Sequence, residues 1–266
     1  CGKPSRYFAV LRMDVDDLGG TNGALSRAVQ DFVAEVAETI REHGGLLVYA
    51  GGDDLVALLP VATALRAVAS LSSTFSLTCS PLTLSAALSF AHVKTPFATL
   101  LRDTQTLLDD YAKRRMRKDA LVISLEQRTT TGARWLGRWE SAMVPDAAEL
   151  ELQAVGRALD DPGCAASNRF LARLPRLLTG FDLRASKDDD EHFPRIVDVV
   201  TAMALRSAAE EDRAFDPVLT RSALERALRF CWPFEVTVGR SVERADSFAP
   251  DGLVLLRFLR REAGLA

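Results

Sequence analysis

Several features are scarce in this chain of 266 residues, and each scarcity excludes a class of protein. The four cysteines form no C-x-x-C pair and the three histidines are scattered, which argues against a local zinc site and against a disulfide framework. No apolar run approaches the roughly 18 residues of a membrane-spanning helix, so we expect no membrane partner. The composition indicates a cytoplasmic protein with reduced thiols.

An excess of charge of one sign is also lacking. Lysine and arginine total 33 against 36 for aspartate and glutamate, a formal net charge of −3. This balance excludes a generally basic nucleic-acid coat, although a local basic patch stays compatible with it. The chain begins Cys-Gly-Lys-Pro, without an initiator methionine or a hydrophobic signal segment, and we expect a piece of a longer protein.

The first half of the chain alternates between strand-like and helix-like patterns. Apolar runs predict strands over 7–14, 46–50, 55–59, 83–91 and 120–125. Helical spacing predicts helices over 24–43 and 62–75, and a third that ends near 117, with Thr95 as N-cap and Pro96 as its first residue. The resulting β-α-β-β-α-β order, with an added α-β, is typical of a ferredoxin-like or palm sheet backed by helices.

The second half has a different residue pattern, with Leu, Ala and Arg at helical intervals. It predicts helices over 147–160, 167–179, 194–211, 217–231 and 251–263. We therefore expect an α+β protein with a palm domain over 1–133 and an all-α helical domain over 134–266. The acidic run Asp188–Glu191 is interpreted as a solvated loop between helices.

Three carboxylates stand out by position. Asp14 ends the first predicted strand, and Asp53 and Asp54 occupy the tip of a hairpin in Gly-Gly-Asp-Asp. In a β-α-β-β sheet the first strand can lie beside that hairpin, so these groups could converge at one edge. Clustered carboxylates repel unless a cation neutralises them, and Mg²⁺ or Mn²⁺ prefers such oxygen ligands. The pattern predicts a two-metal site that activates a 3′-hydroxyl and stabilises leaving pyrophosphate.

Glycines adjoin these carboxylates. Gly51 and Gly52 remove side chains where a triphosphate would approach the backbone. Gly19 and Gly20 precede the first predicted helix, whose N-terminus is suited to phosphate. The alternative is that Gly-Gly-Asp-Asp is only a well-chosen turn, because Gly and Asp suit turns for conformational reasons.

Five basic residues lie among the six positions from Lys113 to Lys118, at the end of a predicted helix. Cations at a helix C-terminus are favoured by the helix dipole, so a solvated helix end explains the run without any ligand. A nucleotide site needs countercharge, however, and Lys113 is the candidate for phosphate contact.

Residues 7–128 resemble the palm domain of the polymerase-cyclase large subunit of type III CRISPR effector complexes, especially the Cmr type. The matching segments, in order, are MDVDDLGG, VYAGGDDLVALLP, LSAALSFAHVKTP and AKRRMRKDALVISL. The helical remainder resembles the C-terminal domain of that family and ends in LVLLRFLRREAG. The GGDD hairpin is the most specific of these features.

This resemblance implies a cyclic oligoadenylate synthase that joins the α-phosphate of one ATP to the 3′-hydroxyl of another. It implies that Asp14, Asp53 and Asp54 hold Mg²⁺ or Mn²⁺, with Asp53 and Asp54 as catalytic residues. It further implies nucleotide contacts by Gly51, Gly52 and Lys113, to which the helix N-terminus argument adds Gly19 and Gly20. The implied partners are ATP, other subunits of the ribonucleoprotein, and its guide and target RNA.

Other positions match the family less specifically. Asp16 and Asp17 stand at acidic positions of the first motif, and His92 stands in AHVKTP, where a lone histidine is more often packed than catalytic. The His-Asp pair of the family's nuclease domain and its zinc-binding cysteines are missing from this sequence, so no DNase activity is assigned.

Two other functions compete with this interpretation. A diguanylate-cyclase-like enzyme would use GTP, but such enzymes carry GGDEF or GGEEF where this chain has Gly-Gly-Asp-Asp-Leu, and Asn22-Gly23 lacks the aspartate expected to read guanine. A non-catalytic palm could instead act as a scaffold within the ribonucleoprotein. Three carboxylates held in mutual repulsion favour catalysis over a scaffold.

Overall fold

The fold is taken from a computed structural model, which describes residues 5–19, 23–126, 132–178, 192–209, 214–231, 235–238, 241–244 and 251–263. The chain divides into two compact units, Cys1–Glu151 and Leu152–Ala266. Gly20 and the acidic run Asp188–Glu191 lie outside the described residues.

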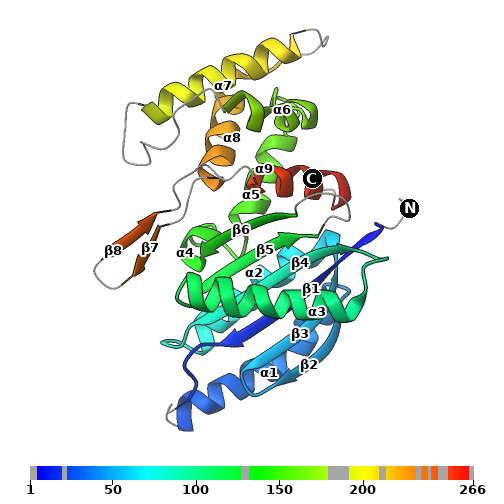
Figure 1. Ribbon diagram of the computed structural model, residues 1–266, viewed down its shortest axis with the longest axis vertical. Coiled ribbons are helices and arrows are strands. Elements are labelled where there is room, and N and C mark those ends of the chain that lie inside the picture. Colours follow the sequence, from blue (N-terminus) through cyan, green and yellow to red (C-terminus); the bar gives the residue numbers. More distant parts are fainter. Residues whose placement is uncertain are drawn as a thin grey trace. The chain divides into compact units, whose positions relative to one another are not determined.

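The first unit is built on a six-stranded sheet with the strand order β2-β3-β1-β4-β5-β6 (Figure 1). The strands are β1 (Tyr7–Val15), β2 (Leu46–Gly51), β3 (Asp54–Pro60), β4 (Leu84–His92), β5 (Ala120–Leu125) and β6 (Ala133–Arg138). β4 and β5 pair in parallel, and the other neighbours are antiparallel. The order of the first four strands confirms the α+β, ferredoxin-like palm predicted from the sequence.

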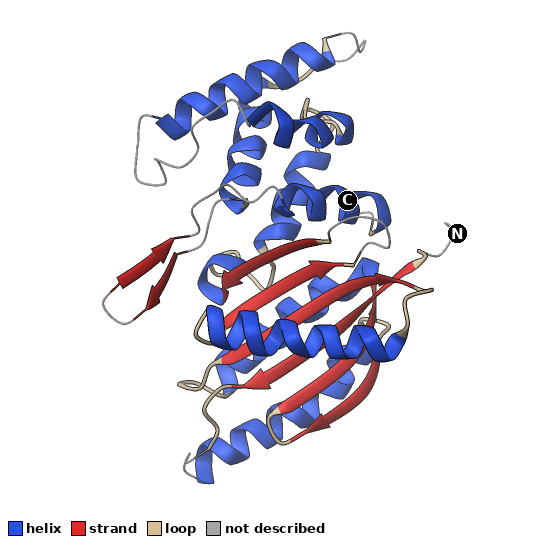
Figure 2. Cartoon of the chain, viewed as in Figure 1, coloured by secondary structure: helices blue, strands red, loops and turns tan. Residues whose placement is uncertain are grey.

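Helices cover both faces of this sheet, which explains why β4 is a nearly continuous apolar run that is buried along its length. α1 (Gly23–Glu42) and α2 (Val61–Thr78) pack together, and the rings of Phe32 and Phe75 meet edge-on with centroids 5.2 Å apart. α3 (Phe97–Thr106) continues directly into the π-helical segment η1 (Leu107–Arg115). Figure 2 shows this long helix in front of the sheet.

The packing of α3 decides which β1 side chains face η1. Leu100 of α3 packs against Val10 of β1 and Ala91 of β4. Because side chains alternate along a strand, Arg12 and Asp14 point to the same face as Val10. Arg12 is hydrogen-bonded to Gln105 of α3, which agrees with this assignment. The strand thus carries its polar residues toward α3 and η1.

The first unit extends past residue 133, where the sequence placed the domain boundary. β6 pairs with β5 along its whole length, from Ala133 opposite Leu125 to Arg138 opposite Ala120. The short helix α4 (Trp139–Ala142) follows, and the indole N–H of Trp139 donates to the backbone carbonyl of Leu84 over 2.6 Å. These contacts join the segment after residue 133 to the sheet.

One predicted cap is wrong. Pro96, with an extended backbone (φ −60°, ψ 120°), is the N-cap of α3, and no side chain caps the helix there. The backbone N–H of Thr95 instead donates to the carbonyl of His92 over 2.8 Å, so Thr95 belongs to the turn that leaves β4.

The second unit is mainly helical, as predicted. Its helices are α5 (Glu151–Asp160), α6 (Asn168–Leu178), α7 (His192–Ala208), α8 (Pro217–Phe230) and α9 (Asp251–Glu262). The all-α expectation missed an antiparallel strand pair, β7 (Glu235–Val238) with β8 (Ser241–Arg244). Within the described part of the chain, no helix is both long and apolar enough to cross a membrane.

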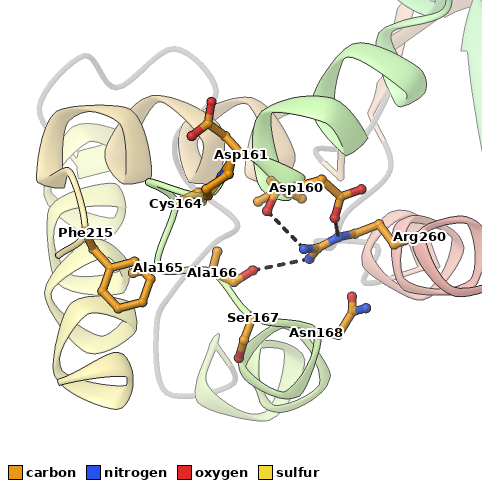
Figure 3. Close-up of a pocket in the computed structure, with 11 residues that line it drawn as sticks. Asp160, Asp161, Cys164, Ala165, Ala166, Ser167, Asn168, Phe215 and Arg260 are labelled. Carbon is orange, nitrogen blue, oxygen red and sulfur yellow. Dashed lines mark hydrogen bonds and ion pairs between the residues drawn. The ribbon is translucent and has the colours of Figure 1, made fainter. Parts of the chain in front are cut away.

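Arg260 of α9 bonds to the C-terminal end of α5 and to the loop before α6 (Figure 3). Its Nε lies 2.5 Å from Asp160 Oδ1, and its terminal nitrogens donate to the backbone carbonyls of Leu159 and Ala166 over 3.0 and 3.2 Å. These residues line a cavity of about 250 Å³. Because protein groups engage all three guanidinium nitrogens, Arg260 serves the packing of α9 on α5.

Candidate functional site

Asp14 and Asp54 face each other across two central strands. Asp14 on β1 is the register partner of Asp54, the first residue of β3. Directly opposite residues of an antiparallel pair point to the same face, so the two carboxylates share the face that carries α3 and η1. The side chain of Asp14 is 14% exposed, and Asp54 is exposed. The structure thereby brings together two of the three predicted metal ligands.

Asp53 lies in the two-residue turn that joins β2 to β3. Its backbone carbonyl accepts a hydrogen bond from the N–H of Val15 over 3.0 Å, which fastens the turn to the end of β1. Its side chain is exposed. Within the described ranges, no group of three or more His, Cys, Asp or Glu residues is arranged to hold a metal ion. Asp53 is therefore near the pair by backbone position without completing a three-carboxylate cluster.

The two turn glycines serve different local needs. Gly52 has a φ of +64°, at the first loop position of a two-residue hairpin, where a type II′ turn requires glycine. Gly51 is covered by Tyr49, whose Oη would lie 2.7 Å from an added Cβ. No heavy atom lies within 4 Å of where a Cβ on Gly52 would be. The turn chemistry alone explains Gly52, and the open space beside it also leaves access for a ligand.

Lys113 reaches the pair from η1. Its Nζ lies 2.6 Å from Asp14 Oδ1, and its side chain is 26% exposed. The wide turn of a π-helix is often found at functional sites, and here it presents the lysine to the sheet face. Lys113, predicted as a phosphate contact, thus forms an ion pair with Asp14.

The electrostatics of Asp14 are those of a crowded carboxylate. Burial raises its pKa from the ordinary 3.8 to about 6, the Lys113 ammonium opposes that rise, and the neighbouring Asp54 carboxylate adds to it. Two facing carboxylates of this kind are suited to a hard divalent cation. Asp14 and Asp54 fit Mg²⁺ or Mn²⁺ as oxygen donors.

The other predicted positions have varied placements. Gly19 is described, and no heavy atom lies within 4 Å of where its Cβ would be, whereas Gly20 lies outside the described residues. His92 is packed edge-on against Tyr7 with centroids 5.3 Å apart, and its Nδ1 accepts the N–H of Lys94. It stands at the far end of β4, seven residues from Ser85, the partner of Asp14. At about 3.4 Å per residue that is roughly 24 Å away, so His92 is a packing residue.

Asp16 and Asp17, which follow the end of β1, have different environments. Asp16 is only 3% exposed and accepts hydrogen bonds from three protein groups, whereas Asp17 has a φ of +56° and an exposed side chain that is paired with Lys118. Asp16 follows Val15, the last residue of β1, and its side chain is held by residues at or just before the start of β4 and in the turn after η1.

Sequence reasoning missed the turn after η1. Arg117, Lys118 and Asp119 have successive positive φ values of 58°, 70° and 50°. Asp119 lies 3.7 Å from Arg138, and burial raises the pKa of its carboxyl against the opposing effect of that arginine. The sequence signal for this turn is the basic run from Lys113 to Lys118, which by itself indicates the end of a helix.

Part of the first unit matches a known family model. Residues 7–122 match the family model described as Cas10/Cmr2, second palm domain. The CRISPR system Cmr subunit Cmr2 of Pyrococcus furiosus is 28% identical over 179 residues, which cover 52% of this chain and 21% of the relative. The chain thus spans about a fifth of the length of that relative.

Two solved structures share the fold. The cryo-EM structure of Type III-B Cmr-beta in the apo state aligns with a TM-score of 0.63 and 12% identity over 97% of this chain and 39% of the other. Cmr-beta bound to cognate target RNA aligns with a TM-score of 0.61 and 13% identity over 98% and 39%. At these identities the similarity concerns the fold, and it extends over both units.

Proposed function

We propose that residues 7–122, which match the family model described as Cas10/Cmr2, second palm domain, carry the nucleotidyl-cyclase site of a type III CRISPR antiviral complex. The reaction would be synthesis of cyclic oligoadenylate from ATP in the cytoplasm. The single observation that supports it most is the facing of Asp14 and Asp54 across β1 and β3, with Lys113 on Asp14.

In this proposal the 3′-hydroxyl oxygen of one ATP attacks the α-phosphorus of another. A phosphodiester bond forms, the bond from the α-phosphorus to the bridging oxygen breaks, and pyrophosphate leaves; repetition and closure make a ring. Mg²⁺ or Mn²⁺ held by Asp14 and Asp54, with Asp53 at the adjoining turn, would lower the pKa of the hydroxyl and neutralise the leaving group.

The remaining residues would position the nucleotide. The side chain of Lys113 is 26% exposed. When a cation binds the Asp14 carboxylate in place of the Lys113 ammonium, the ammonium would be released to contact the triphosphate. The open backbone at Gly52, and at Gly19 with Gly20, would allow close approach of phosphates. Gly51 would contribute once Tyr49, which is 53% exposed, moves aside.

The partners in this proposal follow from the relatives. Cmr2 is named as a subunit of a Cmr system, and the structure of Cmr-beta was solved with cognate target RNA. We infer that this chain acts within such an assembly, with other subunits, a guide RNA and a target RNA. Since it spans 21% of Cmr2, its activity is to be tested both alone and in the assembly.

The test is incubation with ATP, or separately GTP, in the presence of Mg²⁺ or Mn²⁺, with products resolved by mass spectrometry. We expect cyclic adenylates from the chain or from its reconstituted complex with target RNA. The double variant Asp53→Ala, Asp54→Ala should reduce product at least about 100-fold while folding normally, because removing transition-state charge stabilisation costs several kcal/mol. Asp103→Ala, an exposed position on α3, is the matched control.

Each alternative outcome is distinct. A cyclic dinucleotide made from GTP would favour the diguanylate-cyclase-like function. Absence of product from the complete assembly with target RNA would favour a non-catalytic palm, in which Lys113 neutralises Asp14 permanently. Product from a folded double variant would show that Asp53 and Asp54 are not metal ligands.

A further inference from the structure

Asp16 is a buried carboxylate that joins three separate segments. Its Oδ1 accepts the hydroxyl of Ser85 over 2.8 Å, and its Oδ2 accepts the hydroxyl of Thr83 over 2.9 Å and the backbone N–H of Asp119 over 3.1 Å. Ser85 is the second residue of β4, Thr83 immediately precedes that strand, and Asp119 lies in the turn after η1. With a side chain that is satisfied by protein donors and 3% exposure, Asp16 has little capacity left for a metal.

The turn that Asp16 holds is conformationally strained. Residues 117–119 all have left-handed backbone conformations, and none of them is glycine. Non-glycine residues adopt this region only when surrounding contacts compensate for the steric cost. The hydrogen bond from the Asp119 N–H to the Asp16 carboxylate is charge-assisted, which makes it among the stronger contacts available to a backbone group.

The same turn closes the end of η1. The N–H of Met116 donates to the carbonyl of Tyr111 over 2.9 Å, and the N–H of Lys118 donates to the carbonyl of Ala112 over 3.0 Å. These bonds flank Lys113 on the helix. If the turn relaxed, the N–H groups of Met116 and Lys118 would move away from their acceptors and both hydrogen bonds would break. The last turn of η1 would then no longer be held over the sheet.

Lys118 adds a second link between the same segments. Its ammonium is paired with Asp17, the neighbour of Asp16, and this contact raises the pKa of Lys118. The ion pair is largely exposed, so it contributes little compared with the buried contacts of Asp16. The anchoring of the turn therefore depends chiefly on Asp16.

We propose that Asp16 is a positioning residue: it anchors the 117–119 turn to the ends of β1 and β4, and thereby holds Lys113 in place beside Asp14. The role of Lys113 toward a nucleotide rests on the proposed function, whereas the anchoring itself does not. The inference distinguishes Asp16 from Asp14, two residues away in the same acidic motif.

The first experiment measures amide hydrogen exchange in the full chain without nucleotide or metal. Asp16→Ala should speed exchange of the Asp119, Met116 and Lys118 amides together by at least about tenfold, because their acceptors are lost or displaced. Asp16→Asn, whose amide oxygen can still accept the Asp119 N–H, should restore most of the protection. Asp103→Ala serves as the control.

Two hydrogen-exchange results would contradict the anchoring of the 117–119 turn by Asp16. Unchanged protection in Asp16→Ala would contradict it, as would faster exchange at Asp119 with unchanged Met116 and Lys118. If Asp16→Ala fails to fold, Thr83→Ala combined with Ser85→Ala removes the two hydroxyl donors and should loosen the same amides to a smaller extent.

The second experiment is a double-mutant cycle on binding of α,β-methylene-ATP with Mg²⁺. Asp16→Ala and Lys113→Ala should each weaken affinity about tenfold, and the double variant should be little weaker than Lys113→Ala alone, since Asp16 acts through Lys113. Additive losses would overturn the positioning role and favour direct contact of Asp16 with ligand or metal. Absence of binding by the unmodified chain and its complex would count against the proposed function, and hydrogen exchange would still decide the anchoring.

Discussion

Asp14 and Asp54 occupy directly opposite positions of the β1–β3 ladder, and the ammonium of Lys113 lies 2.6 Å from Asp14 Oδ1. The neighbouring Asp54 carboxylate and burial both raise the pKa of Asp14, and the Lys113 ammonium opposes that rise. We therefore expect the site to respond to divalent cations, to pH and to the loss of the lysine, and each response can be measured.

Divalent cations should stabilise the folded chain through the two carboxylates. We expect Mg²⁺ or Mn²⁺ at about 100 times its Kd to raise the free energy of unfolding by about 2.7 kcal/mol, as measured by thermal or urea denaturation. Asp54→Asn should remove most of this increase, whereas Asp103→Asn should retain it. An equal increase in Asp54→Asn would place the cation elsewhere.

The raised pKa of Asp14 should leave a signature in the pH dependence of stability. Because the folded pKa of about 6 exceeds the ordinary 3.8, the folded chain binds the proton more tightly than the unfolded chain. The contribution of Asp14 is therefore most favourable below about pH 4 and declines as pH rises toward 6, by about 2–3 kcal/mol in total.

This decline is measured as a difference, because other carboxylates titrate over the same range. The unfolding free energy of the natural chain minus that of Asp14→Asn, taken in metal-free buffer, should fall between pH 4 and 6.5 and then level off. A difference that stays flat, or rises with pH, would contradict the burial of Asp14 beside Asp54.

Removal of the lysine should affect nucleotide binding more than folding. Lys113→Ala should raise the Kd for ATP about 10- to 100-fold, the range expected for losing a charge-assisted contact of roughly 1.5–3 kcal/mol. Lys94→Ala, which changes an exposed lysine in the turn after β4, should leave the Kd within about twofold. Comparable losses in both variants would indicate general charge attraction instead of a specific contact.

The glycines should differ in their tolerance of a methyl group. Gly52→Ala should lower the free energy of unfolding by about 1 kcal/mol, because φ of +64° is costly for a residue with a Cβ. Gly19→Ala should be nearly neutral, since nothing lies within 4 Å of its Cβ position and its φ is not positive. Urea denaturation measures both variants. A decrease in unfolding free energy for Gly52→Ala no larger than that for Gly19→Ala would show that the turn does not require glycine.

Much of the palm could be predicted because its signals are local. Apolar runs and Gly-Gly-Asp-Asp located β1, β2 and β3 within a residue or two, and the chain order of strands and helices indicated the sheet. β6 was missed because ARWLGR carries no clear strand alternation and is a strand through its pairing with β5. Thr95 was misassigned because Pro96 itself takes the N-cap position.

The amino-acid sequence by itself determined the α+β class, the hairpin with Asp53 and Asp54, and the acidic end of β1, since each depends on neighbours in the chain. Only the tertiary structure decided that Asp14 meets Asp54 and Lys113, while Asp16 turns inward to Thr83, Ser85 and Asp119. Those partners lie 67 to 103 residues from Asp16 along the chain. Hydrogen bonds and charge pairs act over a few ångströms in space, so the roles of carboxylates in one short motif diverge only when the fold supplies their partners.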